Sequence, residues 1–333
     1  MEKLRVEREK ALLFGSAAAV RLLLAAAFPA LPDLLTGRVE ISTPVTSFKR
    51  LQEGLFLYNH GLSPYDGGVF HQAPLFLPLF SLLPDPSRFP LATVLLYTVV
   101  DLLSANALMQ IAESGEASNS DKPAALAPFF LRQALTLTLG VAVLFLLSYG
   151  LTNSWSFIPS VYLSRLLLPD LTPNVGLWWY FFIEMFDSFR AFFLGVFWLH
   201  MASYSPGLTI RLRTQPLAVV VLLWGIFTVF QPYANVGDAG AWIAMLTLYG
   251  HVFELTRYTF PAMSTLLYST LLGPAFYYLW IYAGSGNANF FYAITLVWSL
   301  GLTVIVADML YAILRDEWEL ERPEMKGKDV RQI

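Results

Sequence analysis

The sequence predicts an all-α protein that crosses a membrane repeatedly as a polytopic helical bundle. Of its 333 residues, 56% are hydrophobic and only 14% are charged, whereas soluble domains carry about 25% charged residues. Apolar runs of about 20 residues recur, and an α-helix needs this length to cross the hydrocarbon core of a bilayer. These runs lack the strict alternation of a membrane β-barrel, so we expect helices.

About eight transmembrane helices can be placed from hydropathy. Each is a continuous apolar stretch, and proline falls mostly in the connections. The apolar segment 75–84 is too short to cross and is expected at the membrane interface. The expected spans are residues 11–30, 89–111, 133–152, 177–205, 216–233, 239–255, 259–283 and 289–313.

Basic residues set the expected orientation. With the N-terminus in the cytosol, 14 Lys and Arg residues fall in cytosolic segments and 5 on the opposite side, while Arg21 and Arg190 lie inside spans. Cytosolic loops carry the excess of Lys and Arg, so both termini are expected there. We expect one integral membrane domain at 1–315 and a cytosolic tail at 316–333, with loops on the opposite side at 31–88, 153–176, 234–238 and 284–288.

Composition excludes several classes of protein and site. The net charge of −3 and the lack of a basic stripe argue against a nucleic-acid partner. Without cysteine, the chain has neither a disulfide framework nor a Cys-based metal site. His200 and His251 stand alone without metal-ligand spacing, so we expect no metal and no cofactor.

The first loop contains the turn sequence SPYDGGVFHQAP at residues 63–74. Asp66 and the two glycines after it are a turn signal. Tyr65, Asp66 and His71, beside a short interfacial segment, suit a polar lipid headgroup. Glu40 and Asp66 could instead be an acid/base or metal pair, and the ordinary alternative is that they are solvated or cap short helices.

The second loop leads into the next span through PDLTPNVGLWWYFFIEMF, residues 169–186. Asp170 and Asn174, in its turn-forming part, are candidate lipid contacts. The tryptophans and tyrosine next to this part have the composition of an interfacial aromatic belt.

Several ionisable residues fall inside or near the expected spans, where they are costly and often functional. Glu184, Asp187 and Arg190 are spaced at steps of three, so Asp187 and Arg190 can pair along one helix face. A pair that docks another helix is as consistent with this pattern as a substrate contact. Asp101 and Asp308 leave the same two alternatives open.

The last distinctive loop interrupts two apolar runs with LWIYAGSGNANFFYAITL, residues 279–296. Its glycines lack a Cβ and admit a close approach to the backbone, and its asparagines offer neutral donors and acceptors. These groups suit sugar hydroxyls and phosphate, and the flanking aromatic rings suit acyl chains. The alternative is a tight helical hairpin. The candidate lipid-binding residues are Tyr282, Gly284, Gly286, Asn287, Asn289, Phe290 and Tyr292.

These stretches carry a resemblance to a known family. With RVEISTPVTSFKRLQEGLFLYNHGLSPYDGGVFHQAPL, WSFIPSVY and NVGDAGAW, they cover most of 38–110 and 150–315 in the family's order. The chain resembles the class U phosphatidylinositol-glycan proteins, subunit U of the glycosylphosphatidylinositol (GPI) transamidase complex. Family members are longer, with about four further spans between the second and third spans of this chain. Losing an even number of spans would preserve the orientation of all later spans.

The resemblance implies residence in the endoplasmic reticulum membrane, with the distinctive loops in the lumen. There the complex removes a C-terminal signal from proproteins and joins the new carboxyl end to a GPI lipid. The subunit would be non-catalytic, and its partners would be the GPI lipid and the other subunits, including the one with a Cys/His protease-like site.

The alternative function is enzymatic. The family is similar in architecture to the polytopic dolichol-phosphate-dependent glycosyltransferases, including the GPI mannosyltransferase. Such an enzyme needs a luminal carboxylate near the end of the first span, and Glu40 is the only well-placed candidate.

Overall fold

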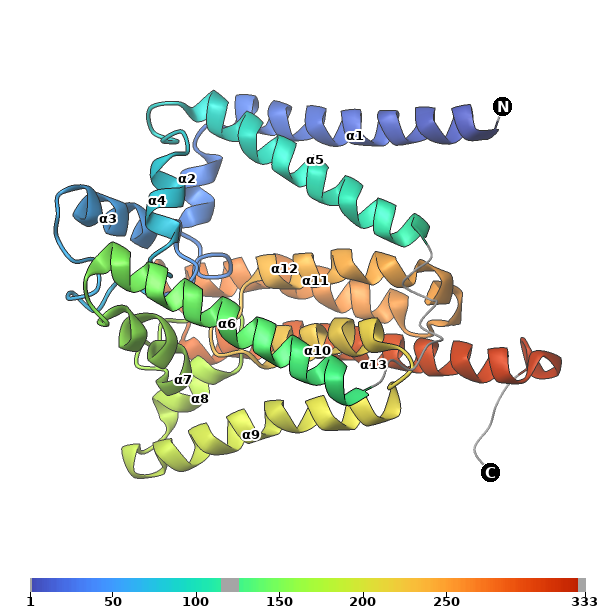
Figure 1. Ribbon diagram of the computed structural model, residues 1–333. Coiled ribbons are helices and arrows are strands. Elements are labelled where there is room, and N and C mark those ends of the chain that lie inside the picture. Colours follow the sequence, from blue (N-terminus) through green and yellow to red (C-terminus); the bar gives the residue numbers. More distant parts are fainter. Residues whose placement is uncertain (1, 115–125, 329–333) are drawn as a thin grey trace. The chain divides into compact units, whose positions relative to one another are not determined.

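The computed structural model describes residues 2–114 and 126–328, and every regular element in these two stretches is a helix (Figure 1). The all-α expectation is therefore confirmed. The described residues form two compact units, one of 2–114 and 126–170 and the other of 171–328. The connector at 115–123 and the end of the tail at 329–333 lie outside the described residues. The expectation of a single membrane domain at 1–315 stays a prediction.

The first unit combines three long helices with several short ones. The long helices α1 and α5 contact each other, and Lys10 Nζ lies 2.6 Å from Glu113 Oε1 between them. Arg21 and Asp101 form a second ion pair between the same helices. The helices of this unit are α1 (Glu2–Ala27), α2 (Leu31–Thr36), α3 (Phe48–Asn59), α4 (Phe76–Ser81), α5 (Pro90–Ser114), α6 (Leu126–Thr152), the π-helix η1 (Ile158–Leu163) and α7 (Ser164–Leu167).

The short elements of the first unit pack around their own apolar cluster. Ser47 caps α3, because its Oγ accepts a hydrogen bond from Arg50 N at 3.3 Å. The helix then places Leu51 in a cluster that also receives residues of the 63–74 turn and of η1. The buried members of the cluster are Leu51, Tyr65, Phe70, Leu77, Phe157 and Val161.

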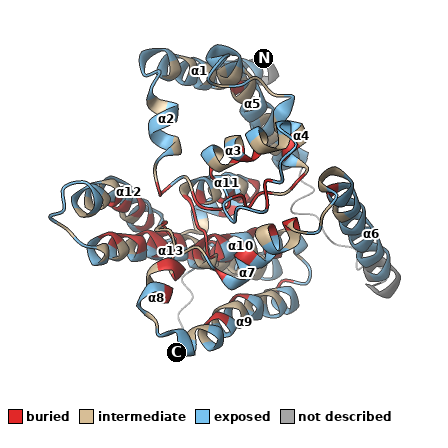
Figure 2. Cartoon of the chain, turned by 90° about the vertical axis from the view of Figure 1, so that its left-hand side faces the viewer, coloured by how far each residue is buried: buried red, intermediate tan, exposed pale blue. Residues whose placement is uncertain are grey.

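The second unit is built around α10, α12 and α13. Helix α12 packs along α13, and α10 contacts α9, α11 and α13. Buried residues gather on α10 and α13, whereas α1 and α6 of the first unit are almost wholly exposed (Figure 2). The helices of the second unit are α8 (Trp178–Glu184), α9 (Asp187–Arg211), α10 (Pro216–Phe230), α11 (Val236–Leu246), the 3₁₀-helix η2 (Thr247–Leu255), α12 (Thr259–Ile281), α13 (Ala288–Glu321) and the 3₁₀-helix η3 (Pro323–Met325).

Each expected span is helical, but the count of eight membrane helices is not confirmed. In the described stretches, four helices are long and apolar enough to cross a membrane: α1, α5, α6 and α13. Helix α10 is apolar but has only 15 residues. The last span also ends later than expected, since α13 continues to Glu321.

The expected span 177–205 is wrong as a single helix. Met185 and Phe186 are extended, with ψ of 140° and 136°, so that α8 ends at Glu184 and α9 begins at Asp187. Aromatic contacts between the two helices favour the break: the Phe181 ring lies 5.0 Å from the Phe197 ring and 5.6 Å from the Phe193 ring. Hydropathy cannot detect this break, because apolar residues are frequent on both sides of it.

The expected span 239–255 is also divided. Asn235 caps α11 by accepting a hydrogen bond from Asp238 N at 3.0 Å. The α-helix then gives way at Thr247 to η2, which contains a non-helical residue, Tyr249. Short 3₁₀ pieces commonly continue the chain at the end of an α-helix in this way.

Candidate functional site

The 283–287 turn is a tight helix-to-helix connection closed by its own backbone. Gly284 has φ of +62°, the left-handed conformation that commonly ends a helix and that glycine adopts without strain. The N–H groups of Ser285 and Gly286 both donate to Leu279 O at 3.0 Å. A Cβ on Gly286 would lie only 3.2 Å from the backbone of Leu279 and Trp280. The close approach that Gly286 permits is therefore one between the turn and the end of α12.

Both asparagines of this turn have internal partners and also outward-facing groups. Asn287 caps α13, because its Oδ1 accepts from Asn289 N at 3.0 Å. The Oδ1 of Asn289 accepts the Tyr180 hydroxyl hydrogen. Both side chains are exposed, and within the described residues neither Nδ2 has a hydrogen-bond acceptor.

Aromatic rings pack together where the turn joins α12 and α13. Tyr292 stacks on Tyr180 with 4.5 Å between ring centroids, and its hydroxyl donates to Leu177 O at 3.2 Å. Trp179 lies parallel to Trp280 at 6.1 Å. In contrast to these packed rings, the side chains of Tyr282 and Phe290 are 67% and 53% exposed. The exposed part of the turn therefore carries polar groups and two accessible rings.

The 171–177 loop supports this region from the side. Asn174 is fully buried; its Oδ1 accepts from Gly176 N at 2.7 Å and its Nδ2 donates to Pro232 O at 3.4 Å. A Cβ on Gly176 would meet Asn174 Oδ1 at 2.8 Å and Ala234 Cβ at 3.1 Å. Asn174 thus joins the 171–177 and 231–235 loops.

Hydrogen bonds connect the 171–177 loop of the second unit to the 231–235 loop and to the start of α13, next to the 282–289 segment. The hydroxyl of Tyr292 links the first of these to α13, and Asn174 links it to the second. We call the exposed part of the 282–290 segment, formed by Tyr282, Ser285, Asn287, Asn289 and Phe290, the turn surface. It can donate hydrogen bonds from two amides and a hydroxyl beside two apolar rings.

The candidate residues of the first loop, together with Asp170 of the second loop, lie in the first unit and are mostly engaged internally. The hydroxyl of Tyr65 donates to Gln72 O at 2.9 Å, and burial raises the pKa of this phenol. His71 is buried, with Nδ1 2.6 Å from Ser160 O. Asp170 accepts from Arg50 Nη2 at 2.9 Å. Asp66 differs from these residues because its side chain is exposed.

The other carboxylates singled out in the sequence have internal partners as well. Glu40 is 9% exposed and accepts two hydrogen bonds from Arg38, at 2.7 and 3.0 Å. Both oxygens of Asp308 accept backbone N–H groups of the 256–258 turn. Asp101 is paired with Arg21. For Asp101 and Asp308, the structure favours helix docking over a substrate contact.

Glu184 and Asp187 do not share one continuous helix, because the chain breaks between them. The guanidinium of Arg190 lies 5.5 Å from the centre of the Phe182 ring. This contact joins α9 to α8 across the break and stabilises the fold through a cation–π interaction.

Sequence reasoning missed two contributors to the turn surface. Tyr180 holds Asn289, and Trp179 packs beneath the turn, yet both belong to a cluster that the sequence assigned to an interfacial belt. That assignment is wrong for Trp178 and Trp179, which are 0% and 1% exposed. Aromatic composition does not distinguish a belt from a buried layer, so the sequence contained no signal for these contacts.

Comparison with known proteins identifies relatives along most of the chain. The family model described as GPI transamidase subunit PIG-U matches residues 15–128 and 114–298. The GPI transamidase component GAB1 of Saccharomyces cerevisiae is 34% identical over 377 residues, covering 93% of this chain and 96% of the relative. The GPI-anchor transamidase component PIGU of Homo sapiens is 29% identical over 393 residues, covering 87% and 90%.

The comparisons also locate an internal difference in length. The alignment with the yeast protein spans 377 positions but covers 93% of this chain, or about 310 of its 333 residues, so about 67 positions of the alignment have no counterpart in this chain. The two family-model matches overlap at 114–128. This overlap runs from the last residue of α5 to the start of α6, and the sequence indicates that further residues of the family are missing at this connection.

Proposed function

Because this chain belongs to the GPI transamidase subunit PIG-U family, we propose that it is a non-catalytic subunit of the GPI transamidase complex. In this role it helps to recognise or present the GPI lipid for attachment to proprotein C-termini. Its partners are the other subunits, including the one with the Cys/His protease-like site. The family match and the names of the yeast and human relatives support membership of the complex.

The observation that carries the lipid role is the composition of the turn surface. Ser285, Asn287 and Asn289 present a hydroxyl and two amides, while Tyr282 and Phe290 present exposed rings. A GPI headgroup contains sugar hydroxyls and phosphates, which accept hydrogen bonds from such donors. Its acyl chains are apolar and suit the rings. The basic-residue bias supports a luminal position for this surface.

In this proposal, side chains contact the lipid headgroup and the glycines position the turn. The backbone N–H groups of Ser285 and Gly286 are already bonded to Leu279 O, so the headgroup would be held by side chains. Gly284 and Gly286 shape the turn, Tyr292 supports it, and Asn174 holds the neighbouring loop. These residues act by positioning the turn surface.

The first loop offers a second, smaller set of contacts. Asp66 is exposed and can accept hydrogen bonds from sugar hydroxyls or pair with an amino group. Tyr65 and His71 hold the loop in shape through their bonds to Gln72 and Ser160, and Asp170 of the second loop holds it through its bond to Arg50. We include all four in the proposal, with Asp66 as the direct contact.

The experiment replaces Asn289 by Ala in the full chain and measures transfer of a proprotein to GPI in cells lacking the native subunit. A hydrogen bond to a charged phosphate contributes about 1.5–3 kcal/mol, and 1.4 kcal/mol is a factor of ten. We expect GPI use to fall roughly tenfold or more, while the subunit still co-purifies with the complex.

The matched control is Tyr180→Phe. It removes the internal Tyr180–Asn289 bond but leaves the Asn289 amide in place, so GPI transfer should stay near normal. Equal losses in both variants would show that Asn289 only braces the hairpin. Normal transfer in Asn289→Ala would remove the lipid role from this turn and leave membership of the complex untouched.

A different variant distinguishes the glycosyltransferase alternative from the non-catalytic role. Glu40 is engaged by Arg38, which gives no support to a role as a free base. Glu40→Gln should leave peptide cleavage by the assembled complex in place. Loss of sugar transfer from dolichol-phosphate mannose in this variant would favour the enzyme.

A further inference from the structure

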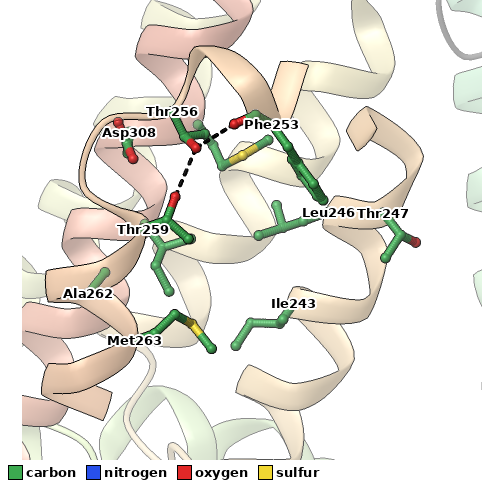
Figure 3. Close-up of a pocket in the computed structure, with 11 residues that line it drawn as sticks. Ile243, Leu246, Thr247, Phe253, Thr256, Thr259, Ala262, Met263 and Asp308 are labelled. Carbon is green, nitrogen blue, oxygen red and sulfur yellow. Dashed lines mark hydrogen bonds between the residues drawn. The ribbon is translucent and has the colours of Figure 1, made fainter. Parts of the chain in front are cut away.

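The second unit contains a cavity far from the turn surface. It has a volume of about 280 Å³ and is lined by residues of α11, η2, α12 and α13. Its floor is buried, while its rim is exposed at Thr247 and Phe253 on one side and at Thr259 and Met263 on the other (Figure 3). The floor consists of Leu246, Ala262, Asp308 and Met309, with Ile243 and Ile305 in the walls.

The polar groups that line the cavity already have partners. The Asp308 carboxylate accepts the N–H groups of Arg257 and Tyr258 at 2.8–3.0 Å. Thr256 Oγ1 donates to Phe253 O at 2.6 Å and lies 2.8 Å from Thr259 Oγ1. An occupant would therefore meet an apolar wall that has little further need of hydrogen bonds. A lining of this kind favours an apolar occupant over ordered water, which needs several polar partners.

The cavity opens onto an apolar face of α12. Met263 on the rim is succeeded at steps of four by Leu267 and Leu271, and the three side chains are 50%, 62% and 66% exposed. Residues four apart lie on one helix face, so the rim continues into a lengthwise apolar stripe. Helix α12 lies in the span expected from the sequence at 259–283, where such a face would meet hydrocarbon. The geometry thus matches a flexible chain that enters along α12.

We infer that this cavity binds one acyl chain of a bilayer phospholipid. The orientation given by the basic residues places the 256–258 turn on the cytosolic side, so the lipid comes from the cytosolic leaflet. This site is independent of the turn surface. Met263 and Tyr282 are 19 residues apart on the chain, which corresponds to about 28 Å along a helix.

The test uses the full chain in its complex, reconstituted in phosphatidylcholine vesicles that contain a phosphatidylcholine with a photoreactive group in its acyl chain. Labelling should occur on peptides covering 243–263 and 305–309. Ala262→Phe places a ring over the cavity floor and should reduce this labelling about tenfold, which corresponds to ~1.4 kcal/mol.

Ala275→Phe is the matched control, because it makes the same change at an exposed position of the same helix. It should leave the labelling unchanged. A second filling variant, Ile243→Phe on the opposite wall, replaces Ala262→Phe if that variant fails to assemble. GPI transfer should stay normal in all three variants, which separates this test from that of the turn surface.

Equal labelling in the filling and control variants would overturn the inference. Labelling confined to the outer stripe at Leu267 and Leu271 would do the same, since it would show only general contact with the bilayer. A cavity that takes up detergent but no vesicle lipid would also count against it. The inference would also be overturned if the label were found on another subunit's membrane helix and not on this chain, since this would indicate that a protein side chain fills the cavity.

Discussion

At the residue scale, the buried carboxylate Asp308 shows how an intramembrane charge serves the fold. Its two oxygens accept N–H groups from Arg257 and Tyr258, just before α12 begins at Thr259. The first N–H groups of a helix lack partners within it, and a negative charge near them is favourable. Asp308 therefore joins α13 to the start of α12 and satisfies two donors there.

Replacing Asp308 by Ala should destabilise the subunit. Hydrogen bonds to charged groups contribute about 1.5–3 kcal/mol each, so we expect a loss of at least this size. Thermal unfolding of the purified chain in detergent measures it. Asp316→Ala is the control, since among the described residues Asp316 makes only a 4.0 Å contact with His251 and its loss should change little. An unchanged unfolding temperature in Asp308→Ala would contradict the capping role.

At the element scale, glycines set how closely the helices of the second unit approach. A Cβ on Gly225 of α10 would lie 2.5 Å from the ring of Trp242 of α11, and one on Gly301 of α13 would lie 2.8 Å from Leu266 of α12. Trp242 is fully buried and donates to Val221 O at 2.9 Å. Its ring therefore cannot move away without losing a hydrogen bond. Small residues at such contacts are typical of helix packing in membranes.

Gly225→Ala should consequently weaken the contact between α10 and α11. Overpacking of a filled core typically costs about 1–3 kcal/mol. The unfolding temperature should fall, and co-purification with the complex should decrease. Gly240→Ala on α11 makes the same change where no atom lies within 4 Å of the new Cβ. That variant should be neutral or slightly more stable, and equal losses in both would point to helix flexibility as the cause.

At the scale of the whole molecule, the orientation in the membrane remains the main prediction. The 14-to-5 distribution of basic residues places the 60–68 turn in the lumen and the 113–122 connector in the cytosol. The native chain has no Asn-X-Ser/Thr acceptor, so an introduced site would be read without background. The turn suits such a site because Gly61, Leu62 and Ser63 are exposed.

An acceptor placed within 60–68 should be glycosylated in the endoplasmic reticulum, and one placed within 113–122 should not. A shift in gel mobility that glycosidase treatment reverses measures the outcome. A position next to Asn174 is unsuitable as the second luminal site, because Asn174 is fully buried. Modification at 113–122 would reverse the orientation and move the turn surface to the cytosol.

The whole chain also differs from its relatives in length. Helices α5 and α6 flank the place where the family has further residues, and only 6% of each apolar window is buried. The window of α13 is 39% buried. Apolar helices with so few protein neighbours are expected to face lipid or other proteins.

The sequence by itself determined the fold class, the family and the approximate position of the long helices. These properties depend on hydropathy, proline placement and the order of segments along the chain, all of which can be read without knowing any contact. Short-range caps could also be anticipated in kind, since Ser47, Asn235 and Asn287 each bond a backbone N–H within three residues. The turn at Gly284 was visible as a candidate hairpin for the same reason.

Only the tertiary structure decided what these residues contact. It divided the 177–205 span, buried Trp178 and Trp179, and joined Tyr180 to Asn289 across 109 positions of sequence. The sequence suggested that Gly286 admits a ligand close to the backbone, but in the structure Gly286 lies in close contact with the end of α12. These outcomes depend on packing between segments far apart in the chain, and hydropathy is the same for an aromatic ring that faces lipid and one that faces protein.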